Sequence, residues 1–274
     1  MLRVGLIGFP VEHSLSPAFQ QAAFDAIGLD IRYELWPTPA EEMAQRMASL
    51  RGPEFLGANV TVPHKQRAFA LMDSVSDIAR RAGAVNTIVN RDGQLHGENT
   101  DVAGFLAPLE QRGMSPSEMT VIVLGAGGAA RGVIVALQSA GCERIVVANR
   151  TVERAANLAK ELGGTLEVCG LDDELNARAE HATLLVNATS LGWEGDRLPC
   201  DEAVLRVLAS DVLVYDLTYR ETPLLRTARR LGLPTLDGLE MLVSQGAESF
   251  RLWTGQEPPF ELMLATARAA AHAR

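Results

Sequence analysis

The composition is that of a chain able to bury a sizeable hydrophobic core. The sequence has 274 residues, of which 47% are hydrophobic, and a formal net charge of −9. A chain of this length favours two domains over one. An acidic chain offers no basic face to phosphates, so we expect no nucleic-acid partner. No apolar leader or membrane-length apolar run is present, which predicts a cytoplasmic protein without a membrane partner.

Metal and disulfide chemistry are not indicated. The histidines lack the short paired spacings of a zinc site, and the three cysteines are scattered singly along the chain. We therefore expect no metal and no disulfide framework.

Short runs rich in Val, Ile and Leu alternate with amphipathic stretches, a pattern typical of strand-helix-strand units and of the α/β class. In the first part of the chain we expect four strands, at 3–8, 31–36, 56–61 and 86–90. The intervening helices are expected at 15–28, 39–50 and 64–81. The polar segment 90–97 predicts a hairpin that closes this part.

A second series follows the loop at 113–116. Its expected strands are 119–124, 144–149, 165–168, 182–186 and 211–216, and its expected helices are 128–140 and 152–162. Two further helices, 239–253 and 260–272, have apolar faces that need a partner. We place them against the first domain. The result is a discontinuous first domain (1–103 and 238–274), a Rossmann-type second domain (104–237) and a cleft between the two.

The glycine-rich segment Gly125-Ala126-Gly127-Gly128-Ala129-Ala130 lies between a predicted strand and a predicted helix. This order fits the G-x-G-x-x-G/A fingerprint of dinucleotide-binding folds. Gly125 permits the tight turn, Gly127 lets the backbone approach a pyrophosphate, and the helix N-terminus offers free N–H groups to phosphates. The sequence therefore predicts a bound dinucleotide.

The following strand ends in Asn149-Arg150-Thr151, where NAD enzymes usually carry an acid for the ribose hydroxyls. Arg150 can pair with a 2′-phosphate, Thr151 can donate to it, and Arg154 lies one helical turn further on. The residues favour NADP. The alternative is that both arginines are ordinary solvated surface charges.

Several short polar clusters stand where strands of the first domain end. They are Ser14-Leu-Ser16, Asn59-Val-Thr61, Asn86-Thr87 and Asn99-Thr100-Asp101. Alternate residues point the same way, so each of the first two clusters can present two polar groups to one ligand. A substrate rich in hydroxyls and carrying a carboxylate would suit them. Taken one by one, the clusters could equally be caps and turns.

Lys65 is one of only two lysines in a chain that otherwise uses arginine for positive charge, the other being Lys160. A lysine can exchange a proton near neutrality when its surroundings favour it, whereas arginine cannot. Asp101 is the expected partner, because an ion pair would hold the ammonium and leave one of its protons for a substrate oxygen.

The ordered motifs closely resemble the shikimate dehydrogenase family from Gly8 to Trp253. The resemblance rests on eight segments: Ser14–Pro17, Asn59–Lys65, Ala82–Thr87, Asn99–Asp101, Gly125–Ala129, Asn149–Thr151, Asn187–Ser190 and Gly238–Gln245. It implies reversible NADPH-dependent reduction of 3-dehydroshikimate to shikimate, on the path to chorismate and the aromatic amino acids.

The resemblance also implies a role for each matching position. Lys65 and Asp101 would form the catalytic pair. The implied substrate contacts are Ser14, Ser16, Asn59, Thr61, Lys65, Asn86, Asp101, Tyr219 and Gln245. The implied cofactor contacts are Gly125, Ala126, Gly127, Gly128, Ala129, Asn149, Arg150, Thr151, Arg154, Ala188, Thr189, Ser190, Leu217, Gly238 and Met241.

Three positions depart from the family pattern. Gln20 stands where histidine is frequent, Val102 where glycine is common, and Trp193 where methionine is usual. None of them removes a proposed catalytic group. Trp193 leaves open how its loop covers the cofactor.

Three rival readings remain. A quinate/shikimate dehydrogenase would often prefer NAD, which Asn149-Arg150-Thr151 disfavours. A non-catalytic NADPH-sensing paralogue would be expected to lack Lys65 or Asp101, and a methylenetetrahydrofolate dehydrogenase would not need the two serines. We expect a monomer or a weak homodimer.

Overall fold

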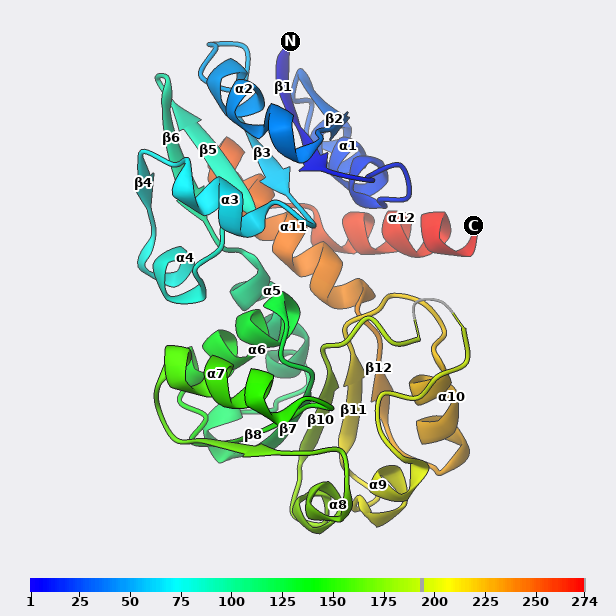
Figure 1. The fold of residues 1–274 in the computed structure, drawn as a ribbon. Coiled ribbons are helices and arrows are strands. Elements are labelled where there is room, and N and C mark those ends of the chain that lie inside the picture. The colour runs from blue at the N-terminus through cyan, green and yellow to red at the C-terminus, as the bar shows by residue number, and fades with distance from the viewer. Residues whose placement is uncertain (193–194, 274) are drawn as a thin grey trace. The chain divides into compact units, whose positions relative to one another are not determined.

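The computed structural model describes residues 1–192 and 195–273 and divides into two compact α/β units (Figure 1). The first unit comprises Met1–Gly104 and Leu242–Arg274, and the second comprises Phe105–Met241. The predicted α/β class and the return of the C-terminal helices to the first unit are confirmed.

The first unit contains a six-stranded mixed sheet with the order β2-β1-β3-β5-β6-β4. Strand β1 (Leu2–Gly8) pairs in parallel with β2 (Ile31–Pro37) and with β3 (Gly57–Val60). Strands β5 (Thr87–Arg91) and β6 (Gln94–Glu98) form an antiparallel hairpin, as the polar segment 90–97 predicts. Because β5 also runs antiparallel to β3, only part of this sheet is parallel.

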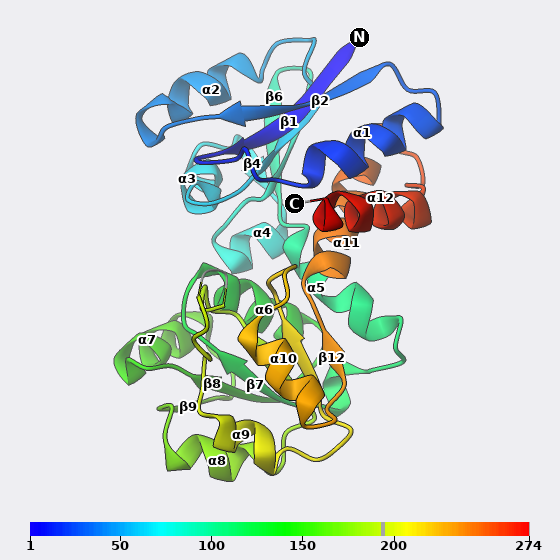
Figure 2. The same cartoon turned by 90° about the vertical axis from the view of Figure 1, so that its right-hand side faces the viewer.

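Helices cover both faces of this sheet (Figures 1 and 2). One hydrophobic core joins the sheet to α2 (Met43–Ser49), which follows the 3₁₀ turn Ala40–Glu42, and to α3 (Lys65–Ala70) and α4 (Asp77–Ala82). The other face carries α1 (Ser16–Ala26), α11 (Leu239–Thr254) and α12 (Phe260–His272). There Phe24 of α1 stacks on Phe250 of α11 with 5.0 Å between ring centroids. This packing gives the C-terminal helices the apolar partner that their sequence requires.

The single helix expected at 64–81 is wrong. Helix α3 ends at Ala70, the chain pairs with β6 through β4 (Ser74–Val75), and α4 begins after Ser76. The Ser76 hydroxyl accepts a hydrogen bond from the Ala79 N–H and so caps α4. A helical pattern that runs through this segment conceals the break, because sheet pairing and a serine cap outweigh local propensity.

Gly57 allows β3 to approach its neighbours closely. Its φ is +153°, and an added Cβ would lie 1.9 Å from the Ile88 carbonyl oxygen and 2.7 Å from Trp253 Nε1. The Trp253 indole N–H donates to that same carbonyl at 2.9 Å. The glycine therefore lets α11 contact the strand that carries Asn59.

The second unit contains a parallel sheet with the order β12-β11-β10-β7-β8-β9, which is the order of a Rossmann fold. Its strands are β7 (Thr120–Leu124), β8 (Arg144–Ala148), β9 (Leu166–Cys169), β10 (Leu184–Asn187), β11 (Leu213–Asp216) and β12 (Thr235–Leu236). The central strands are buried along most of their length, as expected of a sheet covered on both faces.

Helices lie on both faces of this second sheet (Figure 1). Alternate strand residues share one core with α8 (Asp173–Ala179), α9 (Glu202–Val207) and α10 (Pro223–Arg230). The remaining helices are α5 (Asp101–Glu110), α6 (Gly128–Ser139) and α7 (Val152–Leu162), and the 3₁₀ turn Pro116–Glu118 precedes β7. The boundary between the units falls within α5 and within α11.

Among residues 1–192 and 195–273, no helix is long and apolar enough to cross a membrane.

A substitution at Gly57 tests the close approach of β3. We expect Gly57→Ala to lower the free energy of unfolding by about 3 kcal/mol or more, because backbone and indole atoms both occupy the space of the new methyl. Gly28→Ala is the matched control, since Gly28 also has positive φ, +71°, but no atom of the described part of the chain lies within 4 Å of an added Cβ there. Its cost should be about 1 kcal/mol, from backbone strain alone. Urea unfolding measures both, and equal losses would contradict the packing argument.

Candidate active site

Lys65 and Asp101 form an ion pair in the first unit. The Lys65 Nζ lies 2.7 Å from Asp101 Oδ2, and the two side chains are 32% and 19% exposed. Lys65 is the first residue of α3 and Asp101 the first residue of α5, so each side chain projects from the start of a helix. The carboxylate lies at a helix N-terminus, where the helix dipole favours negative charge. The pair is ordered yet open enough to meet a ligand.

Asn86 fixes the orientation of the Asp101 carboxylate. Its Nδ2 donates to Asp101 Oδ1 at 3.0 Å, while Lys65 Nζ donates to the other carboxylate oxygen, Oδ2. The Asn86 Oδ1 accepts from the Thr100 N–H at 2.7 Å, which determines which way the amide faces. The Gln245 Oε1 also accepts from Asn86 Nδ2 at 3.3 Å. Each oxygen of the carboxylate therefore has a separate donor.

A buried polar network lies behind this pair, on the face of the sheet that α11 covers. Asn59 Nδ2 donates to Ser249 Oγ at 2.9 Å and to Thr87 Oγ1 at 3.1 Å. The Ser249 hydroxyl is also 2.8 Å from Thr87 Oγ1 and 3.3 Å from Thr100 Oγ1. Ser249 was not expected from the sequence, because it stands on a helix 190 residues away from Asn59.

The two serines of the first cluster lie at the start of α1. The Ser16 N–H donates to Ser14 Oγ at 3.2 Å, and Ser16 also hydrogen-bonds to the buried Tyr33. Tyr33 donates from its hydroxyl to Asn59 Oδ1 at 2.9 Å. Burial raises the pKa of Tyr33 far above its usual range, so the hydroxyl stays protonated and remains a donor. Tyr33 thus connects the serine cluster to the Asn59 cluster.

Two of the departures from the family pattern are part of the packed interior. Gln20 is fully buried and donates from Nε2 to the Gly246 carbonyl at 2.8 Å, which ties α1 to α11. Val102 is buried in the first turn of α5. Trp193 lies outside the described residues.

The glycine-rich turn joins β7 to α6 in the second unit. Gly125 has φ +112°, and an added Cβ there would lie 3.0 Å from Thr189 Cγ2. At Gly127 and Gly128, by contrast, no atom of another described residue lies within 4 Å of an added Cβ. Open space therefore adjoins the N-terminus of a twelve-residue helix, where free N–H groups attract phosphate.

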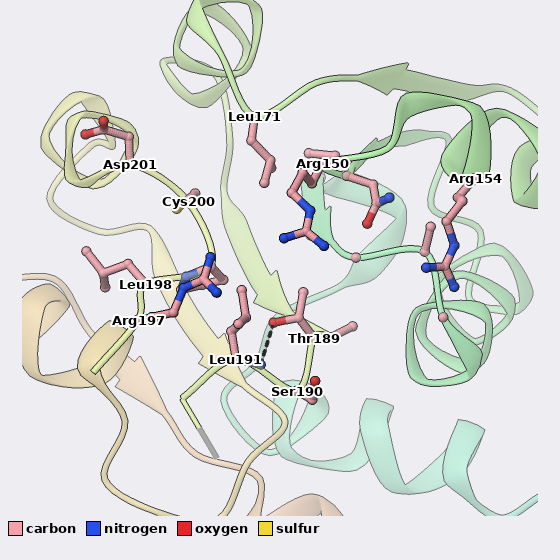
Figure 3. Close-up of a pocket in the computed structure, with 17 residues that line it drawn as sticks. Arg150, Arg154, Leu171, Thr189, Ser190, Leu191, Arg197, Leu198, Cys200 and Asp201 are labelled. Carbon is pink, nitrogen blue, oxygen red and sulfur yellow. Dashed lines mark hydrogen bonds between the residues drawn. The ribbon is translucent and has the colours of Figure 1, made fainter. Parts of the chain in front are cut away.

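A cavity of about 560 Å³ extends from this turn (Figure 3). Nine of the residues expected to contact the cofactor line it: Gly125, Ala126, Gly127, Asn149, Arg150, Arg154, Ala188, Thr189 and Ser190. Arg150 and Arg154 bring positive charge, and Leu171, Leu191 and Leu198 bring apolar surface. Such a mixture suits a ligand with a flat base at one end and phosphates beside it. These residues fit a 2′-phosphorylated dinucleotide.

A buried carboxylate holds the loop that follows β10. Asp216 Oδ2 accepts from Asn187 Nδ2 at 3.1 Å and from the Thr222 hydroxyl at 2.8 Å. Burial raises the pKa of Asp216, and the hydrogen bonds it accepts lower it in part. Asn187 Oδ1 in turn accepts from the Thr189 N–H and hydroxyl at 3.1 and 2.7 Å. The chain from Asp216 to Thr189 fixes one edge of the cavity.

The other expected cofactor residues do not line this cavity. They are Gly128, Ala129, Thr151, Leu217, Gly238 and Met241. Gly238 packs directly on the backbone of Leu217, the residue that follows β11. An added Cβ at Gly238 would lie 2.0 Å from the Leu217 carbonyl oxygen. Tyr219, expected at the substrate, belongs to the second unit. The other expected substrate residues belong to the first.

The cavity also has lining residues that sequence reasoning missed. They are Ala148, Leu171, Leu191, Arg197, Leu198, Pro199, Cys200 and Asp201. Four of them stand in the segment 198–201, which matches no motif. Burial raises the pKa of the Cys200 thiol to about 12, so it stays neutral at the cavity wall. Within the described part of the chain, no group of three or more His, Cys, Asp or Glu side chains could hold a metal ion.

Comparison with known proteins covers most of the chain. Residues 6–88 match a family model described as the shikimate dehydrogenase substrate binding domain, and residues 109–192 match one described as shikimate / quinate 5-dehydrogenase. Residues 238–268 match the shikimate 5′-dehydrogenase C-terminal domain.

Individual relatives agree with these matches. The shikimate dehydrogenase (NADP(+)) of Moorella thermoacetica is 45% identical, over 95% of this chain and 90% of that protein. The same enzyme of Rubrobacter xylanophilus is 47% identical, over 93% and 91%. The crystal structure of shikimate 5-dehydrogenase from Thermus thermophilus, in complex with NADP(H) and shikimate, has a TM-score of 0.89 and 43% identity, and the match covers 98% of this chain and 100% of that one. The chain belongs to the shikimate dehydrogenase family.

Proposed function

We propose that this protein catalyses the reversible NADPH-dependent reduction of 3-dehydroshikimate to shikimate, a step toward chorismate and the aromatic amino acids. The observation that carries the proposal is the Lys65–Asp101 ion pair, 2.7 Å long and partly exposed, in a chain of the shikimate dehydrogenase family. A non-catalytic paralogue would have no use for an accessible, oriented ammonium group.

The chemistry follows from the charge that develops on the substrate. NADPH, when bound, supplies a hydride to the ketone carbon. Negative charge then builds on the ketone oxygen, where a positioned ammonium stabilises it and can supply the proton. Lys65 takes this role, since one of its three N–H groups points to Asp101 and two remain for the substrate. In the reverse direction Lys65 accepts the proton from the substrate hydroxyl.

Asp101 orients Lys65 and accepts a hydrogen bond from a neighbouring ring hydroxyl. Asn86, Gln245 and Thr61 contribute further polar contacts to the ring. Asn59 contributes indirectly, because it is 4% exposed and its amide is engaged with Tyr33, Thr87 and Ser249. Its effect on the substrate therefore passes through the side chains that it holds in place.

Ser14 and Ser16 hold the substrate carboxylate, with Tyr219 as a further donor. Short hydroxyl side chains at the start of a helix suit an anion, because they can donate hydrogen bonds at the end of the helix where its dipole is positive. A ligand without a carboxylate would leave these donors unused.

In the cofactor part of the proposal, residues 104–237 bind NADP and residues 1–103 with 238–274 bind the substrate. The glycine turn and α6 receive the pyrophosphate, and Arg150, Thr151 and Arg154 receive the 2′-phosphate. The cofactor set is completed by Gly128, Ala129, Leu217, Gly238 and Met241, of which Met241 packs by the nicotinamide.

The protein is a cytoplasmic monomer or weak homodimer, and its net charge of −9 argues against a nucleic-acid partner.

The reaction itself is tested by following the absorbance of reduced nicotinamide. We expect the purified protein to reduce NADP when shikimate is added, and to turn over much more slowly with NAD or with quinate. Faster turnover with quinate and NAD would identify a quinate dehydrogenase instead, and no turnover with shikimate would refute the proposal.

The role of Lys65 is tested by removing its charge. We expect Lys65→Met to lower kcat by about 10²- to 10⁴-fold, the usual contribution of a general acid–base group. The dissociation constant for NADP should stay within twofold. Lys160→Met is the matched control, since Lys160 is the only other lysine and stands exposed on α7. Equal kcat values for the two variants would remove Lys65 from the mechanism.

A further inference from the structure

A third arginine, Arg197, lines the cavity of the second unit together with Arg150 and Arg154. Arg150 follows β8 and Arg154 stands on α7, whereas Arg197 belongs to the segment before α9. In Figure 3 the guanidinium groups of Arg150 and Arg197 point toward each other from opposite sides of the cavity. No motif in the sequence marks Arg197.

None of these three guanidinium groups has a hydrogen bond or an ion pair with another described residue. Elsewhere in the same unit, arginines such as Arg226 and Arg229 are paired with carboxylates. Among the described residues that line the cavity the one carboxylate is Asp201, and its Oδ1 accepts from the Ala203 N–H at the start of α9. The cavity therefore concentrates positive charge that no protein group neutralises.

The backbone that follows Arg197 is anchored. Leu198 packs against the hydrophobic core between the sheet and α8–α10. Pro199 and Cys200 are buried. An arginine next to a buried segment loses less backbone entropy on binding an anion than one on a free loop.

Two guanidinium groups that face each other repel, and an anion between them relieves that repulsion. A phosphate monoester carries about −1.5 to −2 charges at neutral pH and accepts hydrogen bonds from several donors. Of the groups on a dinucleotide, the 2′-phosphate distinguishes NADP from NAD, whereas the adenine and the pyrophosphate are common to both.

We propose that Arg197 is a specificity-determining residue that completes, with Arg150 and Arg154, a three-arginine site for the 2′-phosphate of NADP. The inference rests on the proposed function, of which it specifies one contact. Arg197 acts from the opposite wall to Arg150, so it encloses the phosphate as well as adding charge. Its planar guanidinium can donate two hydrogen bonds to one phosphate, which a lysine cannot reproduce.

The test measures ligand affinity without turnover. Isothermal titration calorimetry with 2′,5′-ADP and with 5′-AMP compares the presence and the absence of the 2′-phosphate. We expect Arg197→Ala to weaken 2′,5′-ADP binding about tenfold, as for loss of a charge-assisted hydrogen bond, and to leave 5′-AMP binding within twofold. Arg150→Ala should show the same selective loss, and Arg197→Lys should retain part of the affinity.

Arg206→Ala is the matched control, because Arg206 is an exposed arginine of α9 outside the cavity lining. Its partner Glu202 also pairs with Arg230 at 2.7 Å, so the helix keeps a second ion pair. This variant should bind both nucleotides like the wild type. Thermal unfolding without ligand should give a midpoint for Arg197→Ala no lower than that of the wild type, since the substitution removes a repelling charge, and such a result excludes loss of folding as the cause of weaker binding.

Two outcomes would overturn the inference about Arg197 and leave the proposed function intact. In one, Arg197→Ala binds 2′,5′-ADP as the wild type does. In the other, it loses affinity equally for both nucleotides, which would assign Arg197 to the adenine or the 5′-phosphate. A wild-type protein that binds 5′-AMP as tightly as 2′,5′-ADP would instead overturn the proposed preference for NADP, and the inference with it.

Discussion

The Lys65–Asp101 ion pair depends on hydrogen bonds beyond the one that joins its two members. Asp101 keeps its orientation because Asn86 occupies its second oxygen, and Asn86 keeps its own because the Thr100 N–H fixes its carbonyl. Behind them, Ser249 joins Asn59, Thr87 and Thr100 in one buried cluster. A buried network of this kind is costly to leave half satisfied, so it specifies one arrangement of the side chains in front of it.

The second unit arranges its charges differently. There the protein surrounds a cavity with three arginines that have no carboxylate partner among the described residues, and it holds one edge of the cavity with the buried Asp216 network. The unpaired positive charge attracts an anionic ligand. The rigid edge keeps the cavity in one shape for that ligand. Repulsion between unpaired cations lowers stability, and a bound phosphate offsets that cost.

Local sequence patterns predict much of this structure. The glycine turn was predictable because strand, turn and helix follow one another directly, and the whole fingerprint lies within a dozen residues. The α/β class follows from the alternation of apolar runs. The scarcity of lysine singles out Lys65, for which Asp101 is the expected ion-pair partner, and the structure brings the two side chains together. Their roles in the reaction, like those of the other site residues, stay predictions.

What the sequence could not predict depends on contacts between distant segments. The break between α3 and α4 arises from pairing of β4 with β6 together with the Ser76 cap, and the helical pattern across the segment conceals it. Tyr33 and Ser249 join the polar network from a strand and a helix far away in the chain. Arg197 stands in a stretch without a motif, so only the shape of the cavity reveals it.

The central claim is that Lys65 and Asp101 act as one unit, and a double-mutant cycle tests it most directly. Turnover of shikimate with NADP is measured for Lys65→Met, Asp101→Asn and the double variant. If the two residues form one unit, the turnover of the double variant should equal that of the less active single variant. Losses that multiply would show that the two residues act independently, and would contradict the account.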